Sequence, residues 1–240
     1  MHLINSSNCN QSNRESLLSE SELRTQSFYD KWIGGKGFRS FIGRLVFNLS
    51  GVAYAGRFIK ASNLDPQDRV LEVGSGLGQI LATSHRKIKS KKTYIGIDIS
   101  YQMIQRSTQF NGSLNQSNPL ESIVASGLQI PFQKNCFDVV LLSHVLKYLP
   151  DSQVAQVLEE IKTVLLPKGR IVLWEFKPYP WTAINHLIVR GSGSHRLRTH
   201  REVETLLEEK GFQNIQPFHI HTPWPPWRNL AYTALSLIHI

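Results

Sequence analysis

The stretch from Val70 to Ile80, VLEVGSGLGQI, constrains the fold of this 240-residue chain more than any other. A short apolar run leads into glycines at alternate positions, Gly74, Gly76 and Gly78, and apolar residues then resume. This order predicts a buried strand, a tight turn and a helix that begins directly after the turn. Glycine permits positive φ angles and carries no Cβ that would keep a ligand off the backbone. The free N–H groups at the helix N-terminus would then face such a ligand.

The spacing of the glycines separates several classes of ligand. A dinucleotide fingerprint, G-x-G-x-x-G, would need its third glycine at Gln79. A phosphate-binding P-loop would need Lys-Ser or Lys-Thr after the glycines, and neither follows. Glu72 precedes the first glycine by two residues, and its carboxylate would repel a pyrophosphate but suits a cationic ligand. The alternative is a plain strand–helix turn that binds nothing.

Strand and helix patterns alternate along the rest of the chain. Strands are expected at residues 92–97, 122–125, 137–143 and 170–176, and helices at 101–110, 151–166, 181–190 and 199–210. Asp151 is expected to cap the second of these helices, and Thr199 with Glu202 fits a capping box for the last. Residues 191–194 read as a flexible Gly-Ser segment. This alternation predicts an α/β fold with a doubly wound, mostly parallel sheet that binds ligands beyond the carboxyl ends of its strands.

The N-terminal quarter of the chain is expected to lie outside this domain. Residues 1–19 are rich in Ser, Asn and Gln and read as a disordered tail. Residues 20–63 predict a helical extension or lid, with one helix from Glu20 to about Gly34 and a second over about residues 38–61. The main domain then spans residues 64–240.

Composition indicates which cellular compartment and which binding partners to expect. Two cysteines in unlike contexts argue against a disulfide framework and fit a reducing, cytoplasmic location. No signal peptide, transmembrane-length apolar run or metal-ligand spacing is evident, so we expect no metal. The net charge of +9 is compatible with nucleic acid or peripheral membrane contact, but a solvated surface is the simpler interpretation. Composition does not predict the oligomeric state.

A second carboxylate follows the next predicted strand. Asp98 ends the run Gly96-Ile97-Asp98-Ile99-Ser100, where a nucleotide-type site places an acceptor for two ribose hydroxyls. The neighbouring Ile99 would lie against a base. Asp98 could instead cap the following helix, but Ser100 serves that purpose, so carboxylates at two successive strand ends favour a ligand site.

Together these motifs resemble the class I S-adenosylmethionine (SAM)-dependent methyltransferases, in particular the ubiquinone/menaquinone-type branch. The resemblance covers about residues 64–212. It includes Ala125 to Phe132 (ASGLQIPF), similar to the family's G-D-A-x-x-L-P-F, and Phe137 to Val140 (FDVV). It implies a seven-stranded Rossmann-like sheet and SAM as the cofactor. One departure is Ser126, which stands where the family usually has the acidic residue that holds the adenine amino group.

The resemblance also implies the residues that bind the cofactor: Tyr29, Glu72, Gly74, Ser75, Gly76, Gly78, Asp98, Ile99, Met103, Ser126, Gly127, Leu128 and Ser143. Backbone groups of Gly127 and Leu128 could read the adenine edge in place of the missing carboxylate. Tyr29 would close over the methionine end.

The same resemblance implies in-line transfer of the sulfonium methyl group to an O, C or N atom. His144 is the candidate catalytic base at the end of the fourth strand, although it could merely pack beside the cofactor. His186, His195 and His200 are weaker candidates for that role. Glu175 is another candidate, although it could simply bond nearby backbone. Tryptophans with apolar flanks suggest a planar or lipid-like small-molecule substrate.

Three alternatives stay open: an RNA-modifying methyltransferase or RNA-binding module, a nicotinamide dehydrogenase, and a SAM-binding partner protein without catalysis. A separate hypothesis concerns residues 235–240, LSLIHI, which the DNA string CTG TCT CTT ATA CAC ATC encodes. This string is a transposon end used in sequencing libraries. We therefore expect these six residues to be an assembly artefact; the alternative is a genuine apolar strand end, since Leu235, Leu237 and Ile238 would fit on a sheet.

Overall fold

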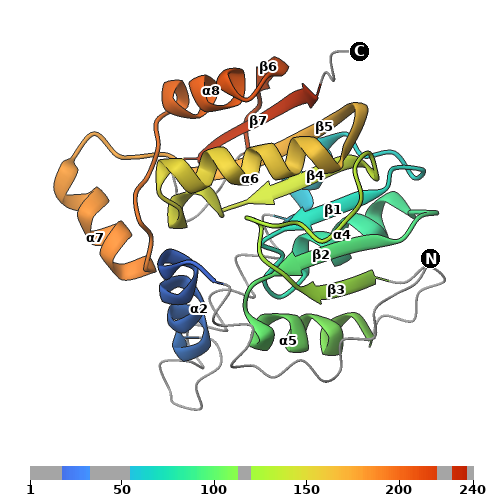
Figure 1. Ribbon diagram of the computed structural model, residues 1–240, viewed down its shortest axis with the longest axis horizontal. Helices are drawn as coiled ribbons and strands as arrows, with labels where there is room; N and C mark the ends of the chain where they lie inside the picture. The colour runs from blue at the N-terminus through green and yellow to red at the C-terminus, as the bar shows by residue number, and fades with distance from the viewer. Residues whose placement is uncertain (1–17, 33–54, 113–119, 221–228, 237–240) are drawn as a thin grey trace.

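A seven-stranded sheet forms the centre of the computed structural model, which describes residues 18–32, 55–112, 120–220 and 229–236 (Figure 1). The strand order is β3-β2-β1-β4-β5-β7-β6, and β7 alone runs antiparallel to its neighbours. The strands are β1 (Val70–Val73), β2 (Tyr94–Asp98), β3 (Leu120–Val124), β4 (Phe137–Ser143), β5 (Leu165–Phe176), β6 (Phe212–Pro217) and β7 (Asn229–Ser236). The predicted doubly wound, mostly parallel α/β fold is confirmed.

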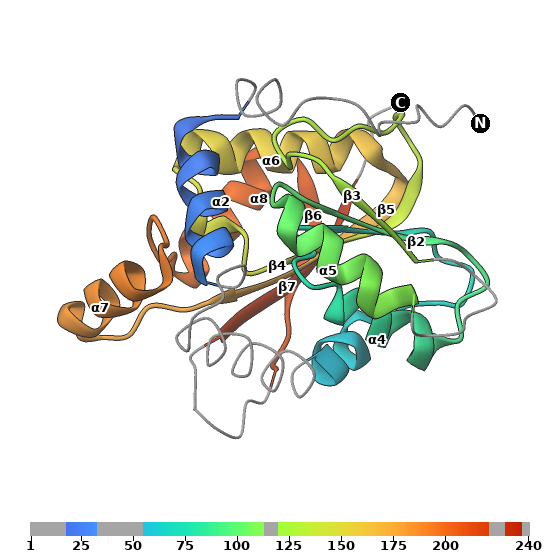
Figure 2. The same ribbon diagram turned by 90° about the horizontal axis from the view of Figure 1, so that it is seen from below.

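Helices cover both faces of the sheet. They are α2 (Glu20–Trp32), α4 (Gln79–Ile88), α5 (Tyr101–Gly112), the 3-10 turn η1 (Leu146–Tyr148), α6 (Asp151–Val164), α7 (Thr182–Ser192) and α8 (His200–Glu209). Helices α6 and α8 lie on one face of the sheet and α4 lies on the other (Figure 2). Helices α2 and α7 lie beside the end toward which β3 and β4 point (Figure 1).

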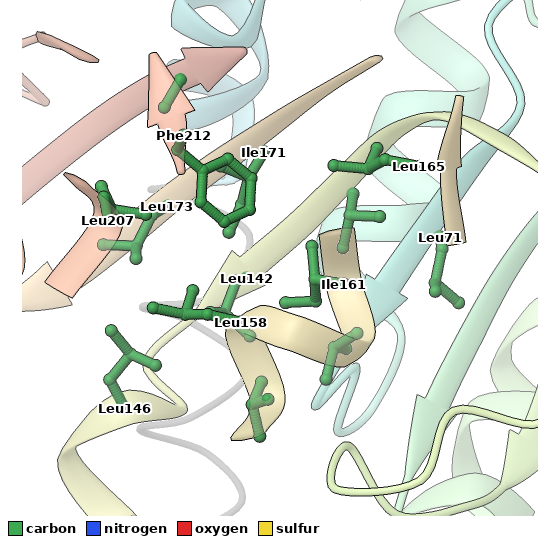
Figure 3. Close-up of a cluster of buried hydrophobic side chains, with 14 of the residues drawn as sticks. Leu71, Leu142, Leu146, Leu158, Ile161, Leu165, Ile171, Leu173, Leu207 and Phe212 are labelled. Carbon is green, nitrogen blue, oxygen red and sulfur yellow. The ribbon is translucent and has the colours of Figure 1, made fainter. Parts of the chain in front are cut away.

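The hydrophobic core has one cluster on each face of the sheet. The larger cluster packs α6 and α8 onto β1, β4 and β5, with Leu142, Leu158 and Leu173 fully buried (Figure 3). The second packs Phe58 and Leu81 against the opposite face. Because both faces are covered, β4 reads as the apolar run FDVVLLS rather than as an alternating pattern. Burial of this kind fixes the sheet rigidly beneath the site.

Most predicted boundaries agree with the structure, and two need correction. Helix α6 ends at Val164 and β5 begins at Leu165, whereas the sequence suggested a helix through Leu166 and a strand from residue 170. Leu165 is fully buried and pairs with Phe137, and the register shifts before Val139, so the Pro-Lys-Gly segment is an irregularity inside the strand. Asp151 is the first residue of α6, not its cap.

Other expectations at the helix ends can be compared directly. The capping box of Thr199 and Glu202 is present at the start of α8. Gly191 and Ser192 belong to α7, and Gly193 ends this helix with a φ of 67°, so half of the predicted flexible segment is helical. Residues 55–62 are helical, but the rest of the helix expected over residues 38–61 lies outside the described residues, as does the predicted disordered tail up to residue 17.

The parts of the chain that the structure describes contain no helix that is both long and apolar enough to cross a membrane.

Candidate active site

The glycine turn after β1 has an open surface at its centre. Gly74, Gly76 and Gly78 all have positive φ angles, 72°, 53° and 71°. A Cβ added to Gly74 would lie 2.3 Å from Val145 Cγ2, whereas a Cβ at Gly76 would meet no atom of the described residues within 4 Å. Gly74 is therefore required by the packing of the protein itself. The space above Gly76 is free for a ligand to approach the backbone.

Two polar side chains of the same motif turn into the protein. Glu72 is buried, and its Oε2 accepts a hydrogen bond of 3.2 Å from the backbone N–H of Leu81 in the first turn of α4. Burial raises the pKa of Glu72 well above its ordinary value, and Asp98 adds to this increase. The Ser75 hydroxyl packs against Gly96, where an added Cβ would lie 2.7 Å from Oγ, and it has no hydrogen-bond partner among the described residues. The side chains of Glu72 and Ser75 thus contact the protein interior and stabilise the turn.

Asp98 joins the glycine turn to the end of β2. Its Oδ2 accepts a hydrogen bond from Gly76 N at 2.9 Å, and its Oδ1 accepts one from Ser100 N at 2.8 Å. Burial raises the pKa of Asp98 to about 6, and the nearby Asp30 contributes in the same direction. Ser100 Oγ accepts from Met103 N at 3.2 Å and so caps α5, as predicted. Asp98 keeps lone pairs for the hydroxyl groups of a ligand.

The loop after β3 lies next to Asp98. Ala125 N donates to the Asp98 carbonyl at 3.0 Å, and Ser126 Oγ accepts from Leu128 N at 2.9 Å. The Ser126 hydroxyl also donates to Oε1 of Glu22, a buried residue of α2. A Cβ at Gly127 would lie 2.9 Å from Val73 Cγ1, so this glycine is needed for close packing on β1. The structure thus brings a carboxylate to the loop that lacks one in sequence.

Helix α2 lies over the ends of β2 and β3 and makes several contacts there. Tyr29 packs with Leu77 and Met103, and its hydroxyl is hydrogen-bonded to that of Tyr148. Gln26 Nε2 donates to the Ile99 carbonyl at 3.4 Å, and Asp30 Oδ1 accepts from Ser100 Oγ at 2.7 Å. Three predicted cofactor residues therefore meet here, because Tyr29 is part of α2 and Ile99 and Met103 contact this helix.

His144 follows Ser143 at the carboxyl end of β4 and has a φ of 57°. The backbone N–H of His144 donates to the Trp174 carbonyl at 2.7 Å, and the imidazole ring stacks on Phe176 with a centroid distance of 4.2 Å. Burial lowers the pKa of His144 well below its ordinary value, and the positive charge of Lys147 has the same effect. The imidazole is therefore neutral at neutral pH, and its Nδ1 has no partner within the described part of the chain.

Sequence reasoning did not identify the buried cation beside His144. Lys147 Nζ donates to the His144 carbonyl at 2.8 Å and lies 4.6 Å from the ring centre of Tyr148 and 4.9 Å from that of Phe176. Burial lowers the pKa of Lys147 to about 8, although the carboxylate of Glu175 opposes this effect. A lysine in the motif VLKYLP gives no sign of this burial, because only the fold turns it inward.

The remaining candidate bases have other contacts. Glu175 is buried and accepts from Leu146 N at 2.9 Å, and burial raises its pKa. His200 Nδ1 is hydrogen-bonded to the Tyr232 hydroxyl. His186 and His195 are exposed. Of the four histidines, only His144 lies at the end of a central strand. No group of three or more His, Cys, Asp or Glu that could hold a metal occurs in the described residues.

The open surface and the hydrogen-bond acceptors of this site fit SAM. An open surface above Gly76, a carboxylate at β2 and a second carboxylate at the β3 loop match a ligand that carries hydroxyls and an amino-substituted base. No cationic side chain is hydrogen-bonded to Asp98 or Glu22 in the described contacts, so both carboxylates suit such donors. A separate cleft of about 290 Å³ lies between α2 and η1, lined by residues such as Arg24, Tyr148 and Gln153.

Comparisons with known proteins give a class of domain. A family model described as a methyltransferase domain matches residues 71–173. A ubiquinone/menaquinone biosynthesis C-methyltransferase, UbiE, of Geotalea daltonii is 27% identical over 129 residues, which are 54% of this chain and 54% of that protein. UbiE of Cronobacter sakazakii is 23% identical over 185 residues, 68% of this chain and 73% of its own length. The chain thus spans about half the length of the first relative.

Solved structures show the same fold. The geranyl diphosphate C-methyltransferase of Streptomyces coelicolor has a TM-score of 0.72 at 12% identity and covers 91% of this chain and 99% of its own. A methyltransferase of Haloferax volcanii, solved with the activator Trm112, has a TM-score of 0.69 at 16% identity. The match covers 90% of this chain and 99% of the Haloferax chain.

Fold, glycine turn and domain match together define a class I methyltransferase domain. The sequence relatives reported above are C-methyltransferases of the ubiquinone/menaquinone type, the branch that the sequence resembles.

Proposed function

We propose that this protein is a SAM-dependent methyltransferase that acts on a small planar or lipid-like molecule. The observation that carries the proposal is the space next to Gly76, which none of the described residues occupies and where the Gly76 N–H is hydrogen-bonded to Asp98. The class of the domain and its sequence relatives, UbiE C-methyltransferases, support the same activity. The structural neighbour from Streptomyces coelicolor was solved with S-adenosyl-L-homocysteine, which supports this cofactor class. The cytoplasm is the proposed location, because the two cysteines fit a reducing compartment.

Each part of the site has a role in this proposal. Bound SAM supplies an activated methyl group, so the protein has mainly to position two molecules and to exclude water. Asp98 would accept hydrogen bonds from the ribose hydroxyls, and the backbone around Gly76 would support the methionine part. Tyr29 would cover the site from α2. Glu72 and Ser75 would hold the turn in its shape.

The methyl acceptor would lie at the carboxyl ends of β4 and β5. His144 and Phe176 present stacked rings there, which suits a planar acceptor. The neutral imidazole of His144 has an unpartnered Nδ1 among the described residues and would accept a proton from the acceptor. Lys147, with its pKa near 8, would favour an acceptor that becomes anionic as it loses that proton.

Incubation with methyl-labelled SAM and fractionated cell extract tests the activity directly. Label should enter a lipid or small-molecule fraction, and the His144→Gln variant should transfer label more slowly while S-adenosylhomocysteine still raises its melting temperature. Label in RNA would contradict the proposed acceptor class. A melting temperature that rises with NAD but not with S-adenosylhomocysteine would contradict the cofactor assignment.

A further inference from the structure

Glu22 is a buried carboxylate on α2 that reaches the loop after β3. The two carboxylate oxygens of Glu22 have different hydrogen-bond partners. Oε2 accepts from the backbone N–H of Ser19 at 2.9 Å and from Ser19 Oγ at 2.7 Å, which forms a capping box at the start of α2. Oε1 accepts from Ser126 Oγ. Capping the helix requires only Oε2, so the contact of Oε1 with a loop 104 residues further along the chain calls for another explanation.

The position of Ser126 relative to Asp98 indicates what this oxygen faces. Strands β1, β2 and β3 are adjacent and parallel, so the glycine turn, Asp98 and the Ser126 loop follow one another along one edge of the sheet. Ala125 N donates to the Asp98 carbonyl and holds the last two together. A nucleoside with its sugar hydroxyls at Asp98 and its chain at the glycine turn must extend its base toward β3. The base would therefore meet the pair of Ser126 and Glu22.

We propose that Glu22 recognises the exocyclic amino group of the adenine and so supplies, from α2, the carboxylate that the β3 loop lacks. This inference rests on the proposed function. A carboxylate oxygen has two lone pairs, so Oε1 can accept from Ser126 and from one amino hydrogen at once. Ser126 then serves as a positioning residue that holds Oε1 toward the base. Cofactor recognition thereby depends on α2 being in place.

Two ligands isolate this contact. S-adenosylhomocysteine carries the 6-amino group, and its purine analogue with hydrogen at that position lacks the amino group but keeps the ring nitrogens. Binding of each to the full chain is measured by calorimetry. The wild type should prefer the amino ligand by about tenfold or more, as expected for a hydrogen bond to a charged group. Glu22→Gln should reduce that preference to about threefold or less, because a neutral amide oxygen is a weaker acceptor.

Control variants separate recognition from capping. Ser19→Ala breaks the capping box but leaves Oε1 facing Ser126, so it should weaken both ligands alike and keep their ratio. Glu20→Gln removes an exposed charge two residues away on α2 and should change neither affinity. Ser126→Asp alone sets two carboxylates against each other and should weaken binding, whereas the double variant Glu22→Gln/Ser126→Asp should restore the preference for the amino ligand.

An unchanged ratio in Glu22→Gln would overturn the assignment, as would an equal loss of the ratio in Ser19→Ala. Equal affinity of the wild type for both ligands would overturn the role of Glu22 while leaving the cofactor class intact. Failure of the wild type to bind either ligand would overturn this inference together with the proposed function.

Discussion

Asp98 connects the glycine turn to the start of α5 through hydrogen bonds from Gly76 N and Ser100 N. Both donors are backbone groups, so the carboxylate is held in place before any ligand arrives. Its raised pKa reflects the balance between burial, which disfavours the charge, and these two amides, which favour it. At neutral pH the charged form prevails and can accept from hydroxyl groups.

Affinity for S-adenosylhomocysteine should therefore increase with pH around the Asp98 pKa of about 6. The proton must leave before both oxygens can act only as acceptors, so binding is weak below this pKa and strong above it. From pH 5 to pH 7 we expect affinity to rise roughly tenfold, following the ionised fraction. Calorimetry at several pH values measures this, with the exposed Asp65→Asn as control. A dependence that persists in Asp98→Asn would assign it to another group.

Gly76→Ala should remove cofactor binding while the protein stays folded. The added methyl group meets no atom within 4 Å in the described part of the chain, but it occupies the space next to the turn. The positive φ of 53° costs a non-glycine residue about 1–2 kcal/mol. Gly211→Ala is the matched control, because its φ is 73° and its added Cβ meets mainly the end of the flexible Lys162 side chain. Normal ligand binding in Gly76→Ala would show that the ligand does not contact this turn.

Helix α4 begins with a glycine that offers no side-chain cap, since Gly78 is the N-cap residue. Glu72 on β1 provides the acceptor instead, through its contact with Leu81 N. A motif residue that seemed suited to a cationic ligand thus has a described contact with a helix end. The element therefore depends on a side chain that precedes it by several residues in the chain.

Glu72→Ala should lower the free energy of unfolding by about 1–3 kcal/mol, because the buried Leu81 N–H loses its acceptor. Glu72→Gln keeps an acceptor oxygen and should lose less. The raised pKa of wild-type Glu72 means that the folded state binds more protons than the unfolded state above the ordinary pKa, so its contribution to stability falls as pH rises. Urea unfolding measures the difference in free energy of unfolding between the wild type and Glu72→Gln. This difference should be smaller at pH 7 than at pH 5, because only the wild type loses stability through this group as pH rises. A constant difference would refute the shift.

Strand β7 lies between β5 and β6 and includes the first two of the six residues attributed to a sequencing artefact. Leu235 pairs with Arg170 and Gln213, and Ser236 pairs with Phe212. These pairings are compatible with a sequencing artefact and with a genuine strand end, so the artefact stays a hypothesis. The Ser236 side chain is fully buried, and its hydroxyl has no hydrogen-bond partner among the described residues.

Ser236→Ala should therefore stabilise the protein by about 1 kcal/mol, because an unpaired buried hydroxyl is unfavourable. Ser107→Ala is a contrasting control, since that buried hydroxyl is hydrogen-bonded to Ser122 at 2.9 Å and its removal should destabilise the protein. Thermal unfolding of both variants measures the two changes. Destabilisation by Ser236→Ala would indicate a partner for this hydroxyl.

The sequence predicted the elements whose signals are local and failed where the partner is distant. The glycine turn, the apolar run of β4 and the capping box of α8 are each written within a few residues. The contact of Glu22 with Ser126 spans 104 residues, and the Ser19–Glu22 capping box could have located only the helix itself. Lys147 likewise lies beside a residue that is distant in sequence, Phe176 at the end of β5.

In the whole molecule, the site lies toward one edge of the sheet and β6 forms the opposite edge. The glycine turn, Asp98 and the Ser126 loop occupy the β3-β2-β1 side, whereas α8 packs near β6 at the opposite edge. Helix α2 is held by polar contacts of Gln26, Asp30 and Glu22 and by the packing of Tyr29 on Leu77 and Met103. Among the α2 residues whose burial the structure describes, only Glu22 is buried. A helix of this kind opens locally at a low free-energy cost.

Binding of S-adenosylhomocysteine should therefore slow amide hydrogen exchange most strongly in α2 and in the loop after β3. The ligand would bridge these segments, so their local opening would require it to dissociate. Amides of α8 that exchange by local fraying should change little, because no ligand contact forms at that edge. Exchange measured by mass spectrometry with and without the ligand tests this pattern, and Gly76→Ala provides a binding-deficient control. Equal slowing in α2 and α8 would indicate general stabilisation rather than closure of α2 over the ligand.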